Sequence, residues 1–254
     1  CGLMAPPKGF EKLEYLTGFG NTFSVEALPN ALPFGHNTPQ ICKYSLYAEQ
    51  LNGTAFTAPR AANQRSWLYR IQPSARHEPY SEEKSDLQFA PTVKTPPDQM
   101  RWDPLDMPSK DSRKNFIDGI VRVAESGDPS AKAGIAIYLY AANDSMVNKA
   151  FYNSDGDMLV VPQAGTHYVK TEFGLMVVKP GEIFVIQRGI RFSVLVDEEE
   201  EGIRGYICEV YGGHFKIPDL GPIGANGLAN PQDFLTPKPY FEDEKVEYTV
   251  STKF

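Results

Sequence analysis

Long apolar runs, a secretory leader and an excess of positive charge are all missing from this sequence. No stretch approaches the roughly 18 apolar residues of a membrane-spanning helix, and the segment from Cys1 to Phe10 lacks a leader's charged start and long apolar centre. The 32 acidic and 25 basic residues give a net charge of −7, which offers no attraction to phosphate backbones. We therefore expect a cytoplasmic protein with no membrane or nucleic-acid partner.

Cysteine is also scarce. The three cysteines, Cys1, Cys42 and Cys208, are odd in number, far apart and in no C-x-x-C arrangement. This spacing indicates neither a disulfide framework nor a zinc knuckle, and it fits a reducing compartment. Cys208 lies inside a predicted strand, where a thiol usually serves as a small buried apolar group.

The residues that are abundant favour strands and turns. Of 254 residues, 41% are hydrophobic, which is enough to bury a sizeable core. The 21 glycines, 21 prolines and 12% aromatic residues exclude an all-helical bundle. The composition therefore predicts an all-β protein with few, short helices.

From residue 134 onward, apolar and polar residues alternate in short runs that turn dipeptides such as Asp155-Gly156 and Pro180-Gly181 separate. This spacing predicts a β-sandwich or barrel over residues 134–215 rather than βαβ units. A run of five acids, Asp197–Glu201, interrupts the pattern and is predicted to be a solvated loop. The expected strands begin with alternation at Ile135, Ile137 and Leu139 and continue at Ala150–Tyr152, Met158–Val161, His167–Lys170, Leu175–Val178, Ile183–Ile186, Arg191–Val196 and Tyr206–Tyr211.

Residues 1–133 are predicted to form a β-rich apron around this core. Strand candidates occur at Tyr44–Tyr47, Ala55–Thr57 and Ser66–Ile71, and a proline-rich connector follows over residues 73–108.

One helix is predicted before the sandwich, over Asn115–Ser126. Phe116, Ile120 and Ala124 lie four residues apart there, and Gly127 with Pro129 just beyond is a typical stop signal.

Residues 216–254 are predicted to be a linker. Gly221, Gly224 and Gly227 lack both the P-loop and the dinucleotide-binding patterns, so we interpret Gly221–Pro231 as a rigid junction or subunit contact rather than a phosphate loop. Asn230 as cap, with Pro231 at the first helical position, predicts a short helix through Phe234. The alternation of Val246, Tyr248, Val250 and Phe254 then predicts a strand.

No catalytic, cofactor-binding or metal-binding residue is predicted from these patterns. Neither Ser154 nor Ser193 stands in a G-x-S-x-G elbow, and none of His36, His77, His167 and His214 is followed by the carboxylate of a facial triad. Glu209 and His214 could meet if the chain bends at Gly212-Gly213, as a structural pair or as metal ligands.

One stretch of the predicted sandwich, Gly181–Phe192, resembles the second motif of the cupin superfamily. The glycines match, but Gln187 stands where that motif has proline and Phe192 where it has a metal-binding histidine. The first motif would fall at Phe151, Asn153 and Asp157, again without histidines. The resemblance implies a cupin jelly roll that has lost its metal site, because phenyl rings and one amide cannot replace imidazoles around a divalent ion.

Longer stretches resemble homogentisate 1,2-dioxygenases over nearly the whole chain. They include Tyr15–Asn21, Tyr47–Phe56, Asn63–Ile71, Phe151–Asp157 and Pro218–Pro231. That resemblance implies an iron(II) enzyme that opens the ring of homogentisate with O2, giving maleylacetoacetate in tyrosine and phenylalanine breakdown, and a trimer-based homo-oligomer.

The same resemblance implies that the iron ligands and the catalytic histidine belong to a C-terminal portion beyond Phe254. Residues 216–254 would then lead toward a missing catalytic domain, and we expect this chain alone to bind no iron and to be inactive. A non-catalytic cupin that acts as a binding or structural module remains the alternative, and an enzyme that recruits Glu209 and His214 is a third possibility.

Overall fold

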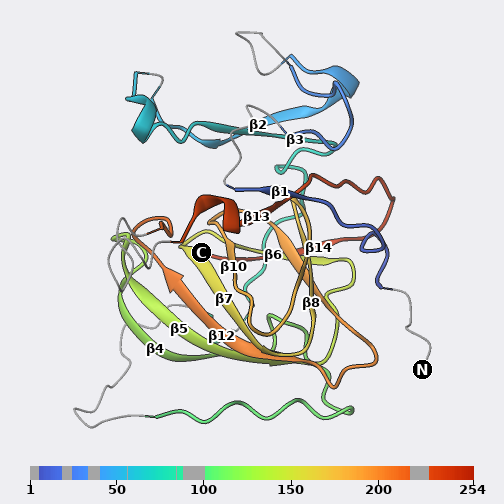
Figure 1. Ribbon diagram of the computed structural model, residues 1–254, viewed down its shortest axis with the longest axis vertical. Coiled ribbons are helices and arrows are strands. Elements are labelled where there is room, and N and C mark those ends of the chain that lie inside the picture. The colour runs from blue at the N-terminus through green and yellow to red at the C-terminus, as the bar shows by residue number, and fades with distance from the viewer. Residues whose placement is uncertain are drawn as a thin grey trace.

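The main body of the protein is a sandwich of two five-stranded sheets, seen in a computed structural model (Figure 1). The structure describes residues 6–18, 25–33, 41–55, 57–83, 85–87, 101–217 and 229–254. The sandwich strands are β4 (Ile120–Asp128), β5 (Ala133–Ala142), β6 (Lys149–Asn153), β7 (Asp157–Ala164), β8 (His167–Thr171), β9 (Gly174–Val178), β10 (Phe184–Ile186), β11 (Phe192–Val196), β12 (Ile203–Val210) and β14 (Thr249–Lys253).

The strand pairing is that of a jelly roll. One sheet has the order β10-β7-β12-β5-β4 and the other the order β14-β6-β11-β8-β9. Within the eight strands β5 to β12, the first pairs with the last, the second with the seventh and the third with the sixth, and β8 and β9 form the central hairpin. This pattern is that of one long hairpin folded over into two sheets. The expected cupin-like, all-β fold is therefore confirmed.

Alternation of the side chains produces the core between the sheets. Along β5, Ala136, Tyr138 and Tyr140 are fully buried, whereas Ile135 and Ile137 on the other face are not. The inward residues of both sheets form one apolar cluster, whose largest side chains are aromatic. The predicted strands of residues 134–215 are all present, within a few residues of their expected ends.

The predicted helix over Asn115–Ser126 is wrong. Residues 116–119 form a turn and β4 follows, paired with β5 along its length. A spacing of four residues fits one helix face, but four is also even and so fits an extended chain as well. In the structure Phe116 lies in the turn, and a bulge between Arg122 and Ala124 places Ile120 beside the buried Tyr140 and Ala124 beside the outward Ile137. The ladder with β5 satisfies the backbone and decides between the two.

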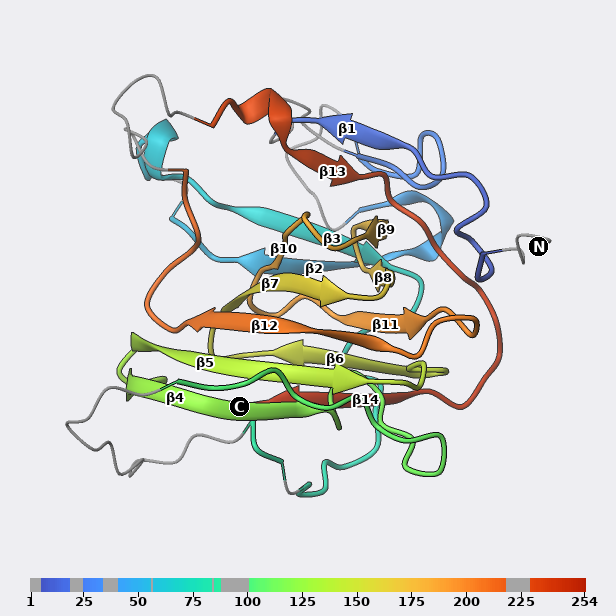
Figure 2. The ribbon, with the colours of Figure 1, turned by 60° about the horizontal axis from the view of Figure 1, so that its bottom comes forward.

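Residues before the sandwich form a two-stranded ribbon and a strap. The ribbon pairs β2 (Tyr47–Asn52) with β3 (Ser66–Arg70), which confirms the strand expected near Ser66. Two other expectations are wrong, because Tyr44 lies in a 3-10 turn, η1 (Lys43–Ser45), and Ala55 begins a turn closed by Ala58. A second 3-10 turn, η2 (Arg60–Ala62), precedes β3. The strap, residues 101–114, has no helix or strand, turns once at residues 109–112 and runs beside the first sheet (Figure 2).

The C-terminal segment returns to the body of the protein. Asn230 caps a single 3-10 turn, η4 (Pro231–Asp233), at the place of the short helix expected through Phe234. Next, β13 (Leu235–Pro237) pairs with β1 (Tyr15–Thr17), and β14 pairs in parallel with β6. Most of the predicted junction Gly221–Pro231 lies outside the described residues. The domain boundaries at 133 and 215 stay a prediction; β4 and β14, from the flanking segments, extend the two sheets.

Candidate functional site

The residues at the cupin ligand positions meet inside the sandwich. Phe151 and Asn153 point inward from β6, and Phe192 lies opposite Phe151 on β11. The two phenyl rings contact edge to face, with centroids 5.7 Å apart, and Phe116 packs on Phe192 at 6.0 Å. All three rings are at most 2% exposed. Aromatic carbon therefore fills the space between these positions.

These residues do not fit an iron ion. Iron(II) in such a site needs imidazole or carboxylate ligands with space for a bound reactant, whereas the rings of Phe151 and Phe192 offer no donor atoms. Among the described residues, no group of three or more His, Cys, Asp or Glu side chains has an arrangement that could hold a metal. The expectation that this chain binds no iron stays a prediction.

A buried ion pair lies beside the rings. Glu209 is fully buried on β12, and its Oε1 lies 2.7 Å from Nζ of Lys253 on β14. The same ammonium contacts Asp155 at 2.8 Å and lies 5.1 Å from the centre of the Tyr211 ring. The cation inside the sandwich is therefore the ammonium group of Lys253.

Two further donors satisfy the Glu209 carboxylate. Asn153 donates from Nδ2 to Oε1 at 2.6 Å, and Tyr138 donates from its hydroxyl to Oε2 at 2.7 Å. Burial, together with the negative charge of Glu209, raises the pKa of the Tyr138 phenol well above its usual range. Each oxygen of Glu209 thus has a charged or hydrogen-bonded partner, which suits a structural ion pair rather than a proton-transfer group.

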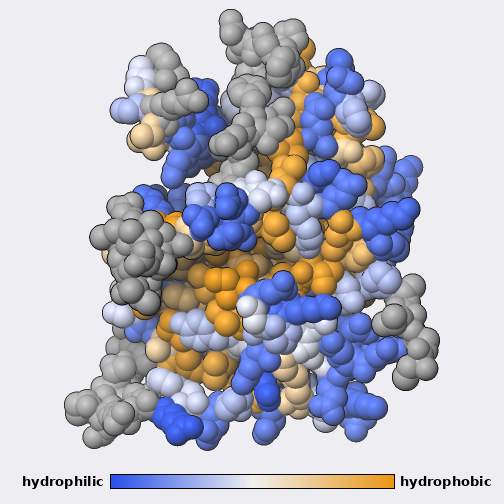
Figure 3. Space-filling view, viewed as in Figure 1, coloured by the Kyte–Doolittle hydropathy of each residue, from blue (hydrophilic) through white to orange (hydrophobic). Residues whose placement is uncertain are grey.

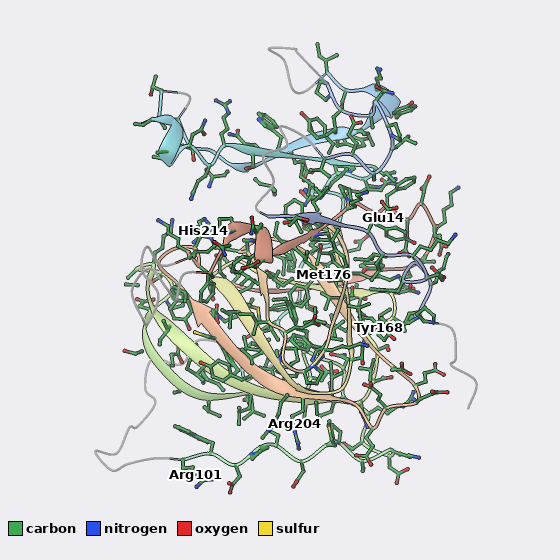
Figure 4. All side chains as sticks on the ribbon, viewed as in Figure 1. Glu14, Arg101, Tyr168, Met176, Arg204 and His214 are labelled. Atoms are coloured by element: carbon green, nitrogen blue, oxygen red, sulfur yellow. The ribbon has the colours of Figure 1, made fainter. Side chains whose placement is uncertain are left out.

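His214 pairs with Asp157 rather than with Glu209. Its Nδ1 lies 2.9 Å from Asp157 Oδ2, and the backbone N–H of Arg188 donates to Oδ1 of the same carboxylate at 2.8 Å. Asp157 is almost fully buried, whereas about a third of the His214 side chain is exposed at one end of the sandwich (Figure 4). Glu209 and His214 therefore form neither the structural pair nor the pair of metal ligands considered above, because Glu209 pairs with Lys253 and His214 with Asp157.

His167 is another buried polar side chain, with a partner at each ring nitrogen. Its Nε2 lies 2.7 Å from the hydroxyl of Tyr140, and its Nδ1 lies 3.2 Å from the carbonyl of Gly165. Burial lowers the pKa of His167 to about 4, so the ring is neutral at pH 7 and donates from Nδ1 while accepting from Tyr140. This arrangement is typical of a satisfied core histidine.

The remaining polar candidates have structural partners. Ser193 donates to the carbonyl of Lys149, and Ser154 lies 3.3 Å from the hydroxyl of Thr252. Cys208 is only partly buried, on the outer face of β12, rather than in the core as expected. A hollow of about 210 Å³ adjoins β8, β9 and β11, but its cations are already paired, Lys170 with Glu242 and Arg191 with Glu172.

Glu209 was identified from the sequence without being placed in the core, and two of its partners, Tyr138 and Lys253, were missed. Glu209 lies two residues after Ile207 and four after Gly205, which both face the core. Because side chains at even spacing share one face of a strand, this spacing could have placed the Glu209 carboxylate inside. No local signal identifies Lys253 or Tyr138 as its partners, because they are 44 and 71 residues away along the chain.

Comparison with known proteins gives one family. The family model described as "Homogentisate 1,2-dioxygenase N-terminal" matches residues 14–254. Curated homogentisate 1,2-dioxygenases are 53% identical over 248 residues in Drosophila melanogaster, 54% over 243 residues in Dictyostelium discoideum and 51% over 250 residues in Homo sapiens. These matches cover 95–96% of this chain but only 55–56% of each relative, so the chain spans about half the length of the relatives.

Solved structures match a smaller part. A cupin-2 domain protein from Shewanella frigidimarina is 19% identical, with a TM-score of 0.29, and the match covers 36% of this chain and 78% of that one. Within the described residues, no helix has the length and apolar character needed to cross a membrane.

Proposed function

Because the chain belongs to the homogentisate 1,2-dioxygenase family, we propose that it forms the N-terminal part of an enzyme that opens the ring of homogentisate with O2. The observation that carries this proposal is the match over residues 14–254, with 51–54% identity to curated enzymes of that name. The reaction would give maleylacetoacetate within tyrosine and phenylalanine breakdown. The non-catalytic module is not favoured, because identity at this level extends over nearly the whole chain.

This part of the enzyme would act as a scaffold. Its sandwich interior is filled by the rings of Phe116, Phe151 and Phe192 and by the Glu209–Lys253 ion pair. The complete enzyme would use iron(II), held by residues that this chain does not contain, and the chain alone would be inactive. We further propose a trimer-based homo-oligomer, to which this scaffold supplies contacts.

The test is oxygen uptake with homogentisate, measured on two proteins supplied with iron(II). One is this chain, and the other is this chain extended at residue 254 with the part of the human relative that follows the match. We expect uptake, together with the absorbance of the ring-opened product, only for the extended chain. Gentisate, which lacks the side-chain methylene, serves as the control substrate.

Two outcomes would contradict the proposal. One is turnover by this chain alone, since no described cluster could hold the iron. The other is an extended chain that folds, as judged by a cooperative melting transition, and binds iron but takes up no oxygen with homogentisate.

A further inference from the structure

The first sheet of the sandwich is apolar on both faces. Its inner face is the core, and its outward positions are also mostly apolar, although only partly buried. Ile135, at one end, is 43% exposed. We call these outward residues the outer face: Val121 on β4, Ile135, Ile137 and Leu139 on β5, Leu159 and Val161 on β7, Val185 on β10, and Tyr206, Cys208 and Val210 on β12.

Strand register makes the outer face continuous. Tyr206 stands beside Leu139 and Val161, and Leu139 stands beside Val121, which gives one apolar row across four strands. A second row runs from Ile137 through Cys208 and Leu159 to Val185, and a third pairs Ile135 with Val210. Directly opposed residues in neighbouring strands have Cβ atoms about 5 Å apart, so the rows form one surface.

Such a surface is unusual for an antiparallel sheet, whose outward face is ordinarily polar when it meets water. Ten residues on strands about 4.8 Å apart, in rows about 7 Å apart, give the outer face an area of roughly 340 Å². Patches of this size on a soluble protein commonly mark a contact site. The space-filling view shows apolar side chains at the surface in the middle of the sandwich (Figure 3).

One end of the outer face already holds a segment of the chain. Arg204 on β12 donates to the carbonyl of Leu105 in the strap at 2.9 Å, and Asn143 donates to that of Pro108 at 3.0 Å. Arg101, where the described part of the strap begins, and Arg204 are labelled at this side of the sandwich in Figure 4. The strap thus binds the polar residues that follow the first row at the Arg204 end of the outer face, and the apolar rows stay partly exposed.

We propose that the outer face is the docking surface for the part of the polypeptide that the longer relatives have and this chain lacks. This rests on the proposed function. The relatives are nearly twice as long as the matched region, and the matching family model is described as N-terminal, so the remaining part follows it. The part that docks would present an apolar surface of its own.

The area of the outer face favours a tethered partner over a second copy of the chain. Two surfaces of roughly 340 Å² would bury about 700 Å² in total. Contacts between domains of one chain span roughly 600–1,500 Å², whereas stable complexes between separate proteins bury about 1,600 Å². A partner on the same polypeptide gains from its high effective concentration.

Strand β14 ends near the third row of the outer face, as is required if the polypeptide that continues after it is to dock there. Lys253 Nζ contacts Glu209, and Val210, the next residue of β12, belongs to the third row of the outer face with Ile135. The C-terminus lies toward this end of β12 in both ribbon views (Figures 1 and 2). A continuation after β14 would therefore start beside the exposed end of the outer face.

Cys208, at the centre of the second row, provides the measurement. Its rate of maleimide labelling is followed by mass spectrometry of its peptide, in this chain and in the chain extended with the remaining part of the human relative. We expect the Cys208 rate to fall at least tenfold in the extended chain. The rate at Cys42, which lies outside the outer face, should stay unchanged. If the extended chain fails to fold, the two parts co-expressed as separate polypeptides give the same comparison.

Matched variants of the extended chain locate the contact. Ile137→Glu should restore fast labelling of Cys208, whereas Val147→Glu, at a 67% exposed position outside the outer face, should not. Equal Cys208 rates in the two proteins would overturn the proposal. So would a dimer of this chain alone, seen by sedimentation and abolished by Ile137→Glu, since a second copy would then be the occupant. Oxygen uptake is measured separately, so that loss of activity with Cys208 protected would count against the proposed function only.

Discussion

At the scale of single residues, the interior of the sandwich depends on one internal cation. Glu209 is completely buried, and an unpaired carboxylate there would carry a large desolvation cost. Lys253, Asn153 and Tyr138 offset that cost together, and only Lys253 brings the opposite charge. The ion pair therefore ties the last strand to the middle of the opposite sheet.

Lys253→Met should lower the free energy of unfolding by about 3–5 kcal/mol, because it leaves Glu209 as a buried charge without its counterion. The double variant Lys253→Met with Glu209→Gln should recover much of this loss, because the fully buried position 209 then carries no charge and the remaining carboxylate, Asp155, is 15% exposed. Urea unfolding of the single and double variants measures both. Lys170→Met is the control: its pair with Glu242 is 26–36% exposed, so the change should stay below about 1 kcal/mol. A loss of equal size in both single variants would contradict the burial argument.

Phe192→Ala should cost about 3–5 kcal/mol, because it removes a ring that packs between Phe151 and Phe116 in a closed core. Thermal and urea unfolding give the value. The partly exposed Phe173, in the β8–β9 turn, is the control, and Phe173→Ala should cost far less. A loss below about 1 kcal/mol at Phe192 would show that the core closes around the gap.

His167 should make the protein less stable as the pH falls. In the unfolded chain the imidazole takes up a proton near pH 6.5, whereas in the folded protein burial lowers its pKa to about 4. The unfolded state therefore binds more protons between these values, and stability decreases across that window, by about 2 kcal/mol between pH 6.5 and 5. Urea unfolding at several pH values tests this, and His167→Gln should flatten the dependence while the exposed His77→Gln should not.

At the scale of elements, the β4–β5 hairpin depends on two glycines that face each other. Gly127 and Gly134 are paired in register, and both have positive φ, +104° and +119°. A Cβ on Gly134 would lie 2.0 Å from the carbonyl oxygen of Ser126 and 2.6 Å from the Cα of Gly127. Both of these atoms belong to the backbone of β4, so the clash cannot be relieved without breaking the hydrogen-bonded ladder between β4 and β5.

Gly134→Ala should therefore lower the free energy of unfolding by about 2 kcal/mol or more, through strain and lost pairing at the hairpin. Gly53→Ala is the matched control, because its nearest neighbour would be a flexible side-chain atom 3.9 Å away. Melting temperatures of the two variants give the comparison. Equal melting temperatures would mean that the hairpin end opens freely without affecting the rest of the sheet.

At the scale of the whole molecule, the described residues form a sandwich whose interior is filled by aromatic rings and by the Glu209–Lys253 ion pair. We predict that this chain binds iron(II) no better than any acidic surface, because Phe151, Asn153 and Phe192 occupy the cupin ligand positions. Anaerobic titration followed by calorimetry is the measurement. Saturable one-to-one binding at low micromolar concentration, abolished by His214→Ala, would instead place a site at the His214–Asp157 pair.

Alternation and matching stretches in the sequence are enough to predict the strands of the sandwich and the family. Alternation along residues 135–211 sets which residues face the core, because side chains in a strand point to opposite faces in turn. Long matching stretches such as Asn63–Ile71 identify the family. The buried position of Phe192 also follows from its motif and is confirmed.

The contacts between distant strands could be seen only in the folded protein. The spacing of Phe116, Ile120 and Ala124 fits a helix and a strand alike, and pairing with β5 settled it. The partner of Glu209 could not be predicted, since Lys253 reaches it only when β14 lies in parallel beside β6. The outer face is equally invisible in the sequence, because register across five strands, rather than any local pattern, brings its rows together.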